Sequence, residues 1–119
     1  MKSKKEIKDD YKEMKFKVGV FQIRNIINNK IYIESSANLV AIWNRYKFQL
    51  KNGLHTNGSL QKEWMEFGEE NFVYEILSEI KQDDNKTMDY RKEAKQLEKM
   101  FIDELLPFDD KGYNIRSAR

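Results

Sequence analysis

A single glutamate, Glu98, stands at a position where a charged side chain is costly. Asp89–Leu106 predicts the longest helix of the chain, and at about 100° per residue its apolar side chains form one continuous arc. The arc consists of Ala94, Leu97, Phe101, Ile102 and Leu105, and Glu98 falls inside it. Two interpretations stay open: the carboxylate pairs with a lysine at the edge of the arc, or it binds a divalent metal or acts as a general base. Because Mg²⁺ prefers carboxylate oxygens and keeps most of its waters, one glutamate can suffice.

The composition restricts the other kinds of chemistry. The chain has no cysteine, which excludes disulfides, thiolate zinc sites, iron–sulfur clusters and a cysteine nucleophile. His55 is the only histidine, so a multi-histidine metal site is excluded as well. Taken alone, His55 fits a surface loop better than a catalytic site. The five glycines are scattered and form no phosphate-binding loop.

Charge is distributed unevenly along the chain. Residues 1–62 include 13 basic and 5 acidic residues, whereas residues 63–119 include 9 basic and 15 acidic residues. Between Lys15 and Lys62 the only acidic residue is Glu34. A segregated basic surface is typical of proteins that bind polyanions. A solvated surface that happens to be uneven remains the alternative.

The length of 119 residues suits one domain with a single core, to which seven phenylalanines, six tyrosines and two tryptophans contribute. We expect an N-terminal helical extension over residues 1–16, with a short solvated helix at Lys4–Lys15, and one domain over residues 17–119. No apolar run reaches the ~18 residues of a membrane span. Met1–Met14 has no apolar signal-peptide region. We therefore expect a cytoplasmic protein without a membrane partner.

Hydrophobic periodicity predicts the elements of this domain. Three segments rich in β-branched and aromatic residues predict strands: Val18–Ile27, Ile31–Ile33 and Phe72–Ile80. Three amphipathic segments predict helices: Ala37–Lys51, Leu60–Phe67 and Asp89–Leu106. Their order indicates a small α/β or α+β domain, in which helices cover a three-stranded sheet.

Polar residues between these segments predict turns and helix starts. Asn28–Asn29 tolerates a positive φ and suits a tight hairpin turn between the first two strands. Ser35 or Ser36 is expected to cap the first of the three helices, and Ser59 the second.

Two further expectations concern the core. The C-terminal tail Gly112–Ile115 is expected to return to it, because Tyr113 and Ile115 are apolar. Trp43 and Trp64 have apolar neighbours at helical spacing, which favours core packing over stacking on nucleic-acid bases.

A series of short motifs covers residues 17–116. In chain order they are Gly19-Val20-Phe21, Tyr32-Ile33-Glu34, Ile42-Trp43-Asn44-Arg45-Tyr46, His55, Leu60-Gln61-Lys62-Glu63-Trp64, Gly68-Glu69-Glu70-Asn71-Phe72, Glu98 and Gly112-Tyr113-Asn114-Ile115. Their order and spacing resemble the GIY-YIG endonuclease family, in the branch related to homing endonucleases. Both signature triplets are altered.

This resemblance implies a small three-stranded antiparallel sheet flanked by helices. It also implies hydrolysis of phosphodiester bonds in nucleic acid with one divalent metal, Mg²⁺ or Mn²⁺, on a glutamate. Around that metal the family places two tyrosines, an arginine, up to two histidines and a late asparagine. A phenol or imidazole accepts the proton of the attacking water. The arginine and the metal stabilise charge on the phosphoryl oxygens.

Four residues match these family positions. The resemblance places Tyr32 at the second motif tyrosine, His55 at the loop histidine and Asn114 at the late asparagine, all three as catalytic residues. It places Glu98 at the metal.

Four other family positions hold different residues. Phe21 replaces the first motif tyrosine and cannot exchange a proton, and Glu34 replaces the motif glycine and adds negative charge. Ile42 stands at the arginine position and Tyr46 at the position of the helix histidine. Loss of one charge stabiliser typically costs about 10²–10³ in rate, and loss of a general base about 10²–10⁴. The pattern suggests a pocket that is no longer selected for cleavage.

Three substitutes remain open. Arg45 could supply the charge that Ile42 lacks, Tyr46 the phenol that Phe21 lacks, and Glu34 a second metal oxygen beside Glu98.

We therefore consider three functions. In the first, the domain binds DNA or another nucleic acid through a basic face with Arg45, Lys47 and Lys51, and cleavage is weak or lost. In the second, it is an active metal-dependent endonuclease with substituted catalytic groups. In the third, it is a protein-interaction module that uses its acidic C-terminal half, with a partner that the sequence does not identify.

Overall fold

A computed structural model of the chain describes residues 16–82 and 89–116. The helix expected at Lys4–Lys15 lies outside these residues. Three strands form one antiparallel sheet: β1 (Gly19–Asn25), β2 (Ile31–Ser36) and β3 (Phe72–Glu79). Their order is β2-β1-β3, so β2 and β3 are the two edges. The α+β class and the antiparallel three-stranded sheet are confirmed.

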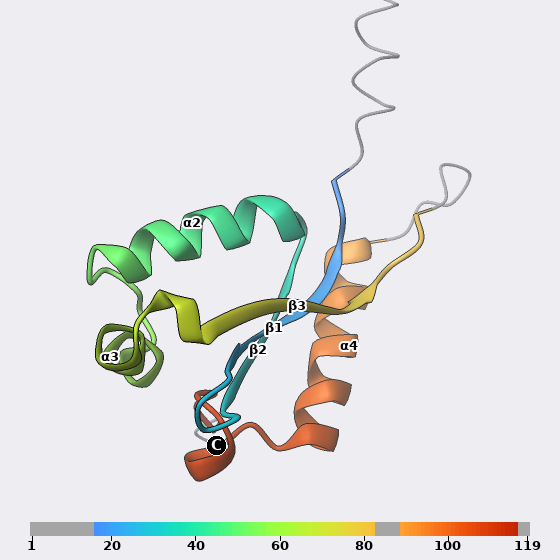
Figure 1. Cartoon of the computed structure of the whole chain (residues 1–119). Coiled ribbons are helices and arrows are strands. Elements are labelled where there is room, and N and C mark those ends of the chain that lie inside the picture. Colours follow the sequence, from blue (N-terminus) through green and yellow to red (C-terminus); the bar gives the residue numbers. More distant parts are fainter. Residues whose placement is uncertain (1–15, 83–88, 117–119) are drawn as a thin grey trace, which may run out of the picture.

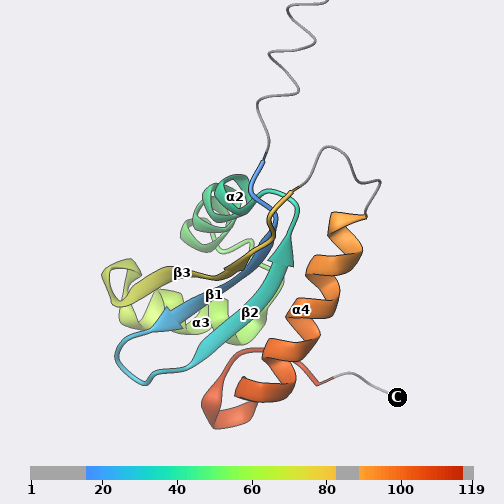
Figure 2. The same ribbon diagram turned by 90° about the vertical axis from the view of Figure 1, so that its right-hand side faces the viewer.

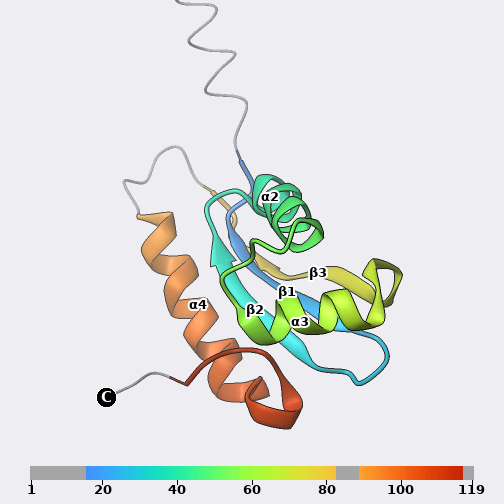
Figure 3. The ribbon, with the colours of Figure 1, turned by 90° about the vertical axis from the view of Figure 1, so that its left-hand side faces the viewer.

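Helices cover both faces of the sheet (Figure 1). One face carries α2 (Leu39–Lys51) and α3 (Gly58–Phe67), and the opposite face carries α4 (Tyr90–Leu105), which runs along β2 (Figures 2 and 3). Two short 3₁₀ helices, η1 (Glu69–Asn71) and η2 (Asp109–Lys111), complete the described elements. No helix in this described part has the length and hydropathy needed to cross a bilayer.

Side-chain alternation along the strands divides the core into two parts. The larger cluster lies against α2 and α3, and its fully buried members include Phe21, Ile23 and Leu50. The smaller cluster contains Ala94 of α4 and flanking residues of the sheet. Burial of one large apolar side chain stabilises the fold by about 1.5–3 kcal/mol, so the amphipathic faces predicted from the sequence stabilise this arrangement.

Gly19 allows β1 and β3 to approach closely. A Cβ at this position would overlap the carbonyl oxygen of Ser78 in β3. The register of the two strands also shifts between Val20 and Phe21, as at a β-bulge. The glycine of the first signature triplet is therefore required by backbone packing.

The predicted helix starts need correction. Asn38 caps α2, because its side-chain oxygen accepts a hydrogen bond from the Ala41 N–H (3.0 Å). Ser35 and Ser36 do not cap it, since both pair with β1 and extend β2 beyond the expected end at Ile33.

The start of α3 differs for a similar reason. Asn57 caps this helix and accepts a hydrogen bond from the Leu60 N–H (2.9 Å), so the expected cap, Ser59, lies inside the helix. The Asn57 side chain also donates to the Tyr113 carbonyl (2.7 Å). The cap thus ties α3 to the C-terminal segment.

That C-terminal segment lies along the open edge of β2. The Tyr113 N–H donates to the Ile31 carbonyl (2.9 Å), next to a parallel bridge between Ile31 and Gly112. Tyr113 is buried as expected, but Ile115 is 81% exposed, so the expectation that both return to the core is wrong for Ile115. The segment covers backbone groups that an edge strand otherwise leaves unpaired.

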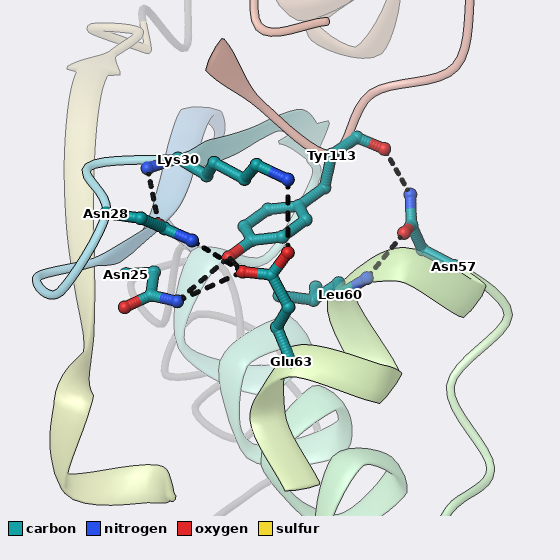
Figure 4. Close-up of polar contacts among 7 residues, drawn as sticks. All are labelled: Asn25, Asn28, Lys30, Asn57, Leu60, Glu63 and Tyr113. Carbon is teal, nitrogen blue, oxygen red and sulfur yellow. Dashed lines mark hydrogen bonds and ion pairs between the residues drawn. The ribbon is translucent and has the colours of Figure 1, made fainter. Parts of the chain in front are cut away.

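A polar network holds the hairpin turn, α3 and the C-terminal segment together (Figure 4). The Glu63 carboxylate accepts hydrogen bonds from the side chains of Asn25, Asn28 and Tyr113 at 2.7–3.2 Å. It also pairs with Lys30 at 3.1 Å. Because Asn25 is fully buried, its amide needs these partners to offset the loss of water.

Candidate active site

The residues expected at the site gather around β2, on two sides of it. The first group lies on the side of the sheet that α2 covers, and it comprises Phe21, Tyr32, Glu34, Ile42, Tyr46 and His55. The second group, Glu98 and Asn114, contacts the backbone of β2 at Ser35 and Ile33. Successive side chains of a strand point to opposite faces, so Glu34 belongs to the first group although its neighbours contact the second.

Glu34 is held between two phenols. The Tyr32 hydroxyl donates to Oε1 of Glu34 and the Tyr46 hydroxyl donates to Oε2, each at 2.6 Å. Hydroxyl–carboxylate bonds of this length are charge-assisted and about twice as strong as neutral ones. Both phenolic protons are therefore engaged, and each oxygen of Glu34 already accepts one hydrogen bond.

The same contacts change the acidity of the phenols. Burial, followed by the charge and hydrogen bonds of Glu34, raises the pKa of Tyr32 and Tyr46 well above the ordinary value for tyrosine. Burial and Glu34 also raise the pKa of Tyr74 to about 12. A proton acceptor works best when its pKa lies near the ambient pH, so these phenols are poorly suited to activate water.

His55 lies against the two tyrosines. Its ring meets Tyr46 edge-on at 4.4 Å and Tyr32 at 6.0 Å between ring centroids. The Asn57 N–H donates to Nδ1 (3.0 Å), which leaves the proton of the neutral ring on Nε2. Burial, and then the charge of Arg45, lowers the pKa of His55. Within the described residues, the buried Nε2 has no hydrogen-bond partner.

Phe21 and Ile42 are part of the core. Phe21 is fully buried and packs against Tyr46 and Tyr74 with ring centroids 6.2 and 5.1 Å apart. Ile42 is buried in the same cluster. Neither side chain can supply the proton transfer or the positive charge of the family positions that they occupy.

Glu98 reaches β2 from α4. Its Oε1 accepts hydrogen bonds from the N–H (2.7 Å) and the hydroxyl (3.2 Å) of Ser35, and its Oε2 lies 3.5 Å from the Lys95 ammonium. The lysine pairing considered for this carboxylate therefore occurs, but the backbone contact is shorter. The role of Ser35 was missed because no local pattern relates a strand residue to a helix 63 positions later.

The surroundings of Glu98 fit at most a metal bound through one carboxylate. In the described part of the chain Oε2 contacts the exposed Lys95, and the Glu98 side chain is 17% exposed. Residues 16–82 and 89–116 contain no group of three or more His, Cys, Asp or Glu side chains placed to hold a metal ion. A Mg²⁺ ion that keeps most of its waters is compatible with one carboxylate, and it would supply positive charge for phosphoryl oxygens.

Asn114 uses its whole amide to bind the edge of β2. Its Oδ1 accepts from the Ile33 N–H and its Nδ2 donates to the Ile33 carbonyl, both at 2.8 Å. The contact imitates a paired strand residue. Asn114 thus has a clear positioning contact in addition to the catalytic place that the resemblance implies.

The three basic residues expected on one face lie on two sides of α2. Arg45 stacks over the Tyr46 ring, with 5.6 Å between Cζ and the ring centroid. Lys47 lies over Trp43 (5.5 Å), and Lys51 pairs with Glu69 (3.4 Å). Positions 45 and 47 are about 200° apart around a helix, so these cations do not form a single surface.

Arg45 instead lines one of two hollows that adjoin where β2 leads into α2. One hollow of about 430 Å³ is lined by Ser36, Ala37, Asn38, Ala41, Ile42 and Arg45. A second, of about 190 Å³, is lined by Ser35, Ser36, Ala37, Arg91, Ala94 and Lys95. Because the hollows share Ser36 and Ala37, we call them together the α2–α4 groove. Arg91 and Lys95 were missed, since both lie in the acidic half of the sequence.

The chain is similar to known proteins in both sequence and structure. No known protein-family profile matches the chain. Over 64 residues the chain is 36% identical to intron-associated endonuclease 1 of Enterobacteria phage T4, a match that covers 54% of the chain and 26% of that protein. The chain thus spans about a quarter of the length of this curated relative.

Two solved structures have the same fold. A mutant of the catalytic domain of the intron endonuclease I-TevI superposes with a TM-score of 0.70 at 30% identity, over 87% of this chain and 98% of that domain. The catalytic domain of the homing endonuclease I-TevI superposes with a TM-score of 0.68 at 30% identity, over 84% and 99%.

Proposed function

The chain belongs to the GIY-YIG endonuclease family, and from this premise we propose that it binds DNA and that its cleavage of phosphodiester bonds is weak or lost. One observation carries the second half of the proposal. Glu34, at the motif glycine position, binds the hydroxyls of both Tyr32 and Tyr46.

The state of the other family positions supports weak cleavage. Attack on phosphorus requires a group that takes a proton from water. The two phenols donate to Glu34, and Nδ1 of His55 already accepts the Asn57 N–H. Phe21 has no ionisable group. The site therefore offers poor proton acceptors where the family has its catalytic groups.

The α2–α4 groove supports DNA binding. Its one hollow is lined by Arg45 of α2, and the adjoining hollow by Arg91 and Lys95 of α4. The Lys95 ammonium also lies 3.5 Å from the Glu98 carboxylate. Cations on the rim of a groove are suited to the phosphates of a nucleic-acid backbone. The relatives named above are endonucleases, and one of them is a homing endonuclease. This similarity supports DNA as the ligand that we propose for this chain.

A second candidate, an active divalent-metal-dependent endonuclease, is favoured by the geometry of Glu98. Two hydrogen bonds from Ser35 orient this carboxylate through Oε1, and its other oxygen lies 3.5 Å from Lys95. Arg45 would then provide the positive charge that Ile42 lacks.

A plasmid-nicking assay with Mg²⁺ or Mn²⁺ separates the two candidates. We expect the wild-type protein to nick supercoiled plasmid at or near background. Robust metal-dependent nicking that disappears in Glu98→Ala would establish the second candidate in place of the first.

DNA binding is tested separately, with a labelled duplex. We expect Arg45→Ala, Arg91→Ala and Lys95→Ala each to weaken binding, and Lys62→Ala, which removes a charge from exposed α3 surface, to serve as the matched control. If all four variants bind as the wild type does, or if binding is absent at low salt, the groove is not the DNA site.

A further inference from the structure

Two hydroxyl donors from different elements converge on one point of the domain. The Tyr32 hydroxyl comes from β2 and the Tyr46 hydroxyl from α2, and each lies 2.6 Å from a separate oxygen of the same carboxylate. Donors fixed by a strand and a helix need little rearrangement when they bind an oxyanion. The point at which they meet thus has the geometry of an anion site.

The surroundings of this point are also suited to an anion. The Arg45 guanidinium lies 5.6 Å from the centre of the Tyr46 ring and brings positive charge to the edge of the cluster. The ring of His55 touches Tyr46 and carries a buried Nε2 donor that has no partner within the described residues. A carboxylate has two oxygens and satisfies the two phenols, whereas a phosphate group has additional oxygens for further donors.

We infer that Tyr32 and Tyr46 form a phosphate-binding site and that the side chain of Glu34 occupies it as an internal competitor of the phosphate group. The inference deepens the proposed function, because it assigns a cause to weak cleavage at the same site. A tethered carboxylate acts at a high effective concentration, so a phosphate in solution competes poorly with it. A phosphate group also meets the repulsion of the Glu34 charge as it enters.

Removal of the internal competitor tests the inference without any nuclease assay. The Glu34→Ala protein is titrated with inorganic phosphate and, in a parallel arm, with a dinucleotide that has one phosphodiester. Binding is measured by the thermal midpoint and by the NMR signals of His55. Its ring contacts Tyr46, and because it is the only histidine its signals are unambiguous. We expect the dissociation constant for at least one ligand to fall by about tenfold or more relative to wild type.

Three controls make the result specific. Glu75→Ala removes a carboxylate that pairs with Arg24 on β1, and it should leave phosphate binding as weak as in wild type. In the Glu34→Ala background, Tyr32→Phe and Tyr46→Phe should each abolish the gained binding. If Glu34→Ala does not fold, Glu34→Gln replaces it, since this variant keeps the side-chain volume and removes only the charge.

The outcomes are decisive in both directions. The tighter of the two ligands identifies whether the site prefers a free phosphate or a nucleic-acid diester. Equal phosphate binding by wild type and the folded Glu34 variant, or a gain that survives both tyrosine substitutions, overturns the inference. Failure of the proposed DNA binding is seen independently, because the duplex titration of the groove variants does not depend on Glu34.

Discussion

Tyr46, on α2, donates a 2.6 Å hydrogen bond to the carboxylate of Glu34, on β2. The bond joins a helix to an edge strand at the position where the family motif has a glycine. A glycine there leaves the phenol free, whereas the glutamate holds it as a hydrogen-bond donor. One substitution in the second signature triplet therefore changes the role of a residue on another element.

Loss of this contact is expected to cost more stability than loss of a neutral one. Tyr46→Phe leaves the half-buried Glu34 with one donor fewer, and we expect a loss of about 1.5–3 kcal/mol. Tyr74→Phe removes a hydroxyl that donates to the Leu39 carbonyl (2.6 Å), and we expect about 0.5–1.5 kcal/mol. Urea denaturation of wild type and the two variants measures both losses of unfolding free energy. Equal losses would contradict a charge-assisted bond between Tyr46 and Glu34.

Stability is expected to fall in acid because of Glu63. Burial raises the pKa of this carboxyl, but the hydrogen bonds from Asn28, Tyr113 and Lys30 and the charge of Lys30 outweigh burial, so the net pKa is lowered. A folded-state pKa below the unfolded value means that the stabilisation is present above about pH 4.5 and is lost as the pH falls through the folded-state pKa.

The measurement is the free energy of unfolding between about pH 7 and pH 3, for wild type and Glu63→Gln. The difference between the two proteins should be largest near neutral pH and should shrink in acid. A constant difference over this range would assign the effect of the substitution to packing and not to the charge of Glu63.

Gly19→Ala is expected to destabilise the sheet, because the added methyl group meets the Ser78 carbonyl across the strand pair. Forcing one extra methyl group into close-packed structure typically costs about 1–3 kcal/mol. Gly58→Ala is the matched control, since a Cβ at Gly58 meets no atom within 4 Å. Thermal or urea unfolding should show a loss for Gly19→Ala and little change for Gly58→Ala. A similar effect of both would exclude the steric explanation.

DNA binding is expected to weaken steeply as salt rises from about 50 to 200 mM, because cation–phosphate contacts release counterions. Each of Arg45→Ala, Arg91→Ala and Lys95→Ala should reduce the slope of log affinity against log salt by about one. Fluorescence anisotropy at several salt concentrations gives the slopes. A slope near zero in the wild type would argue against phosphate contacts.

Restoring the family residues is expected to raise activity only when they are combined. The triple variant Phe21→Tyr, Glu34→Gly and Ile42→Arg regains a phenol, removes the internal carboxylate and adds a phosphate-facing charge. Groups that act as a unit are not additive, so each single variant should remain near background in the nicking assay. Because Ile42 is buried, circular dichroism must first establish that the triple variant folds.

Local patterns were sufficient to predict most of the fold. Alternation and turn residues predicted three strands, and amphipathic spacing predicted three helices, because both depend on neighbours a few positions away. They also singled out Glu98 as a carboxylate inside an apolar arc. The predicted helix caps were wrong, although Ser35, Ser36 and Ser59 have side chains that suit a cap. For the first helix, pairing of β2 with β1 includes Ser35 and Ser36 in the strand and so moves the start of the helix.

Only the tertiary structure decided what the site residues touch. Glu34 meets Tyr46 because α2 packs across the sheet, and Glu98 meets Ser35 because α4 runs along β2 on the other face. Arg91, from the acidic half of the chain, lines a hollow that adjoins the one lined by Arg45. These contacts join residues of different helices and strands, so they depend on how whole elements pack, which no local pattern specifies.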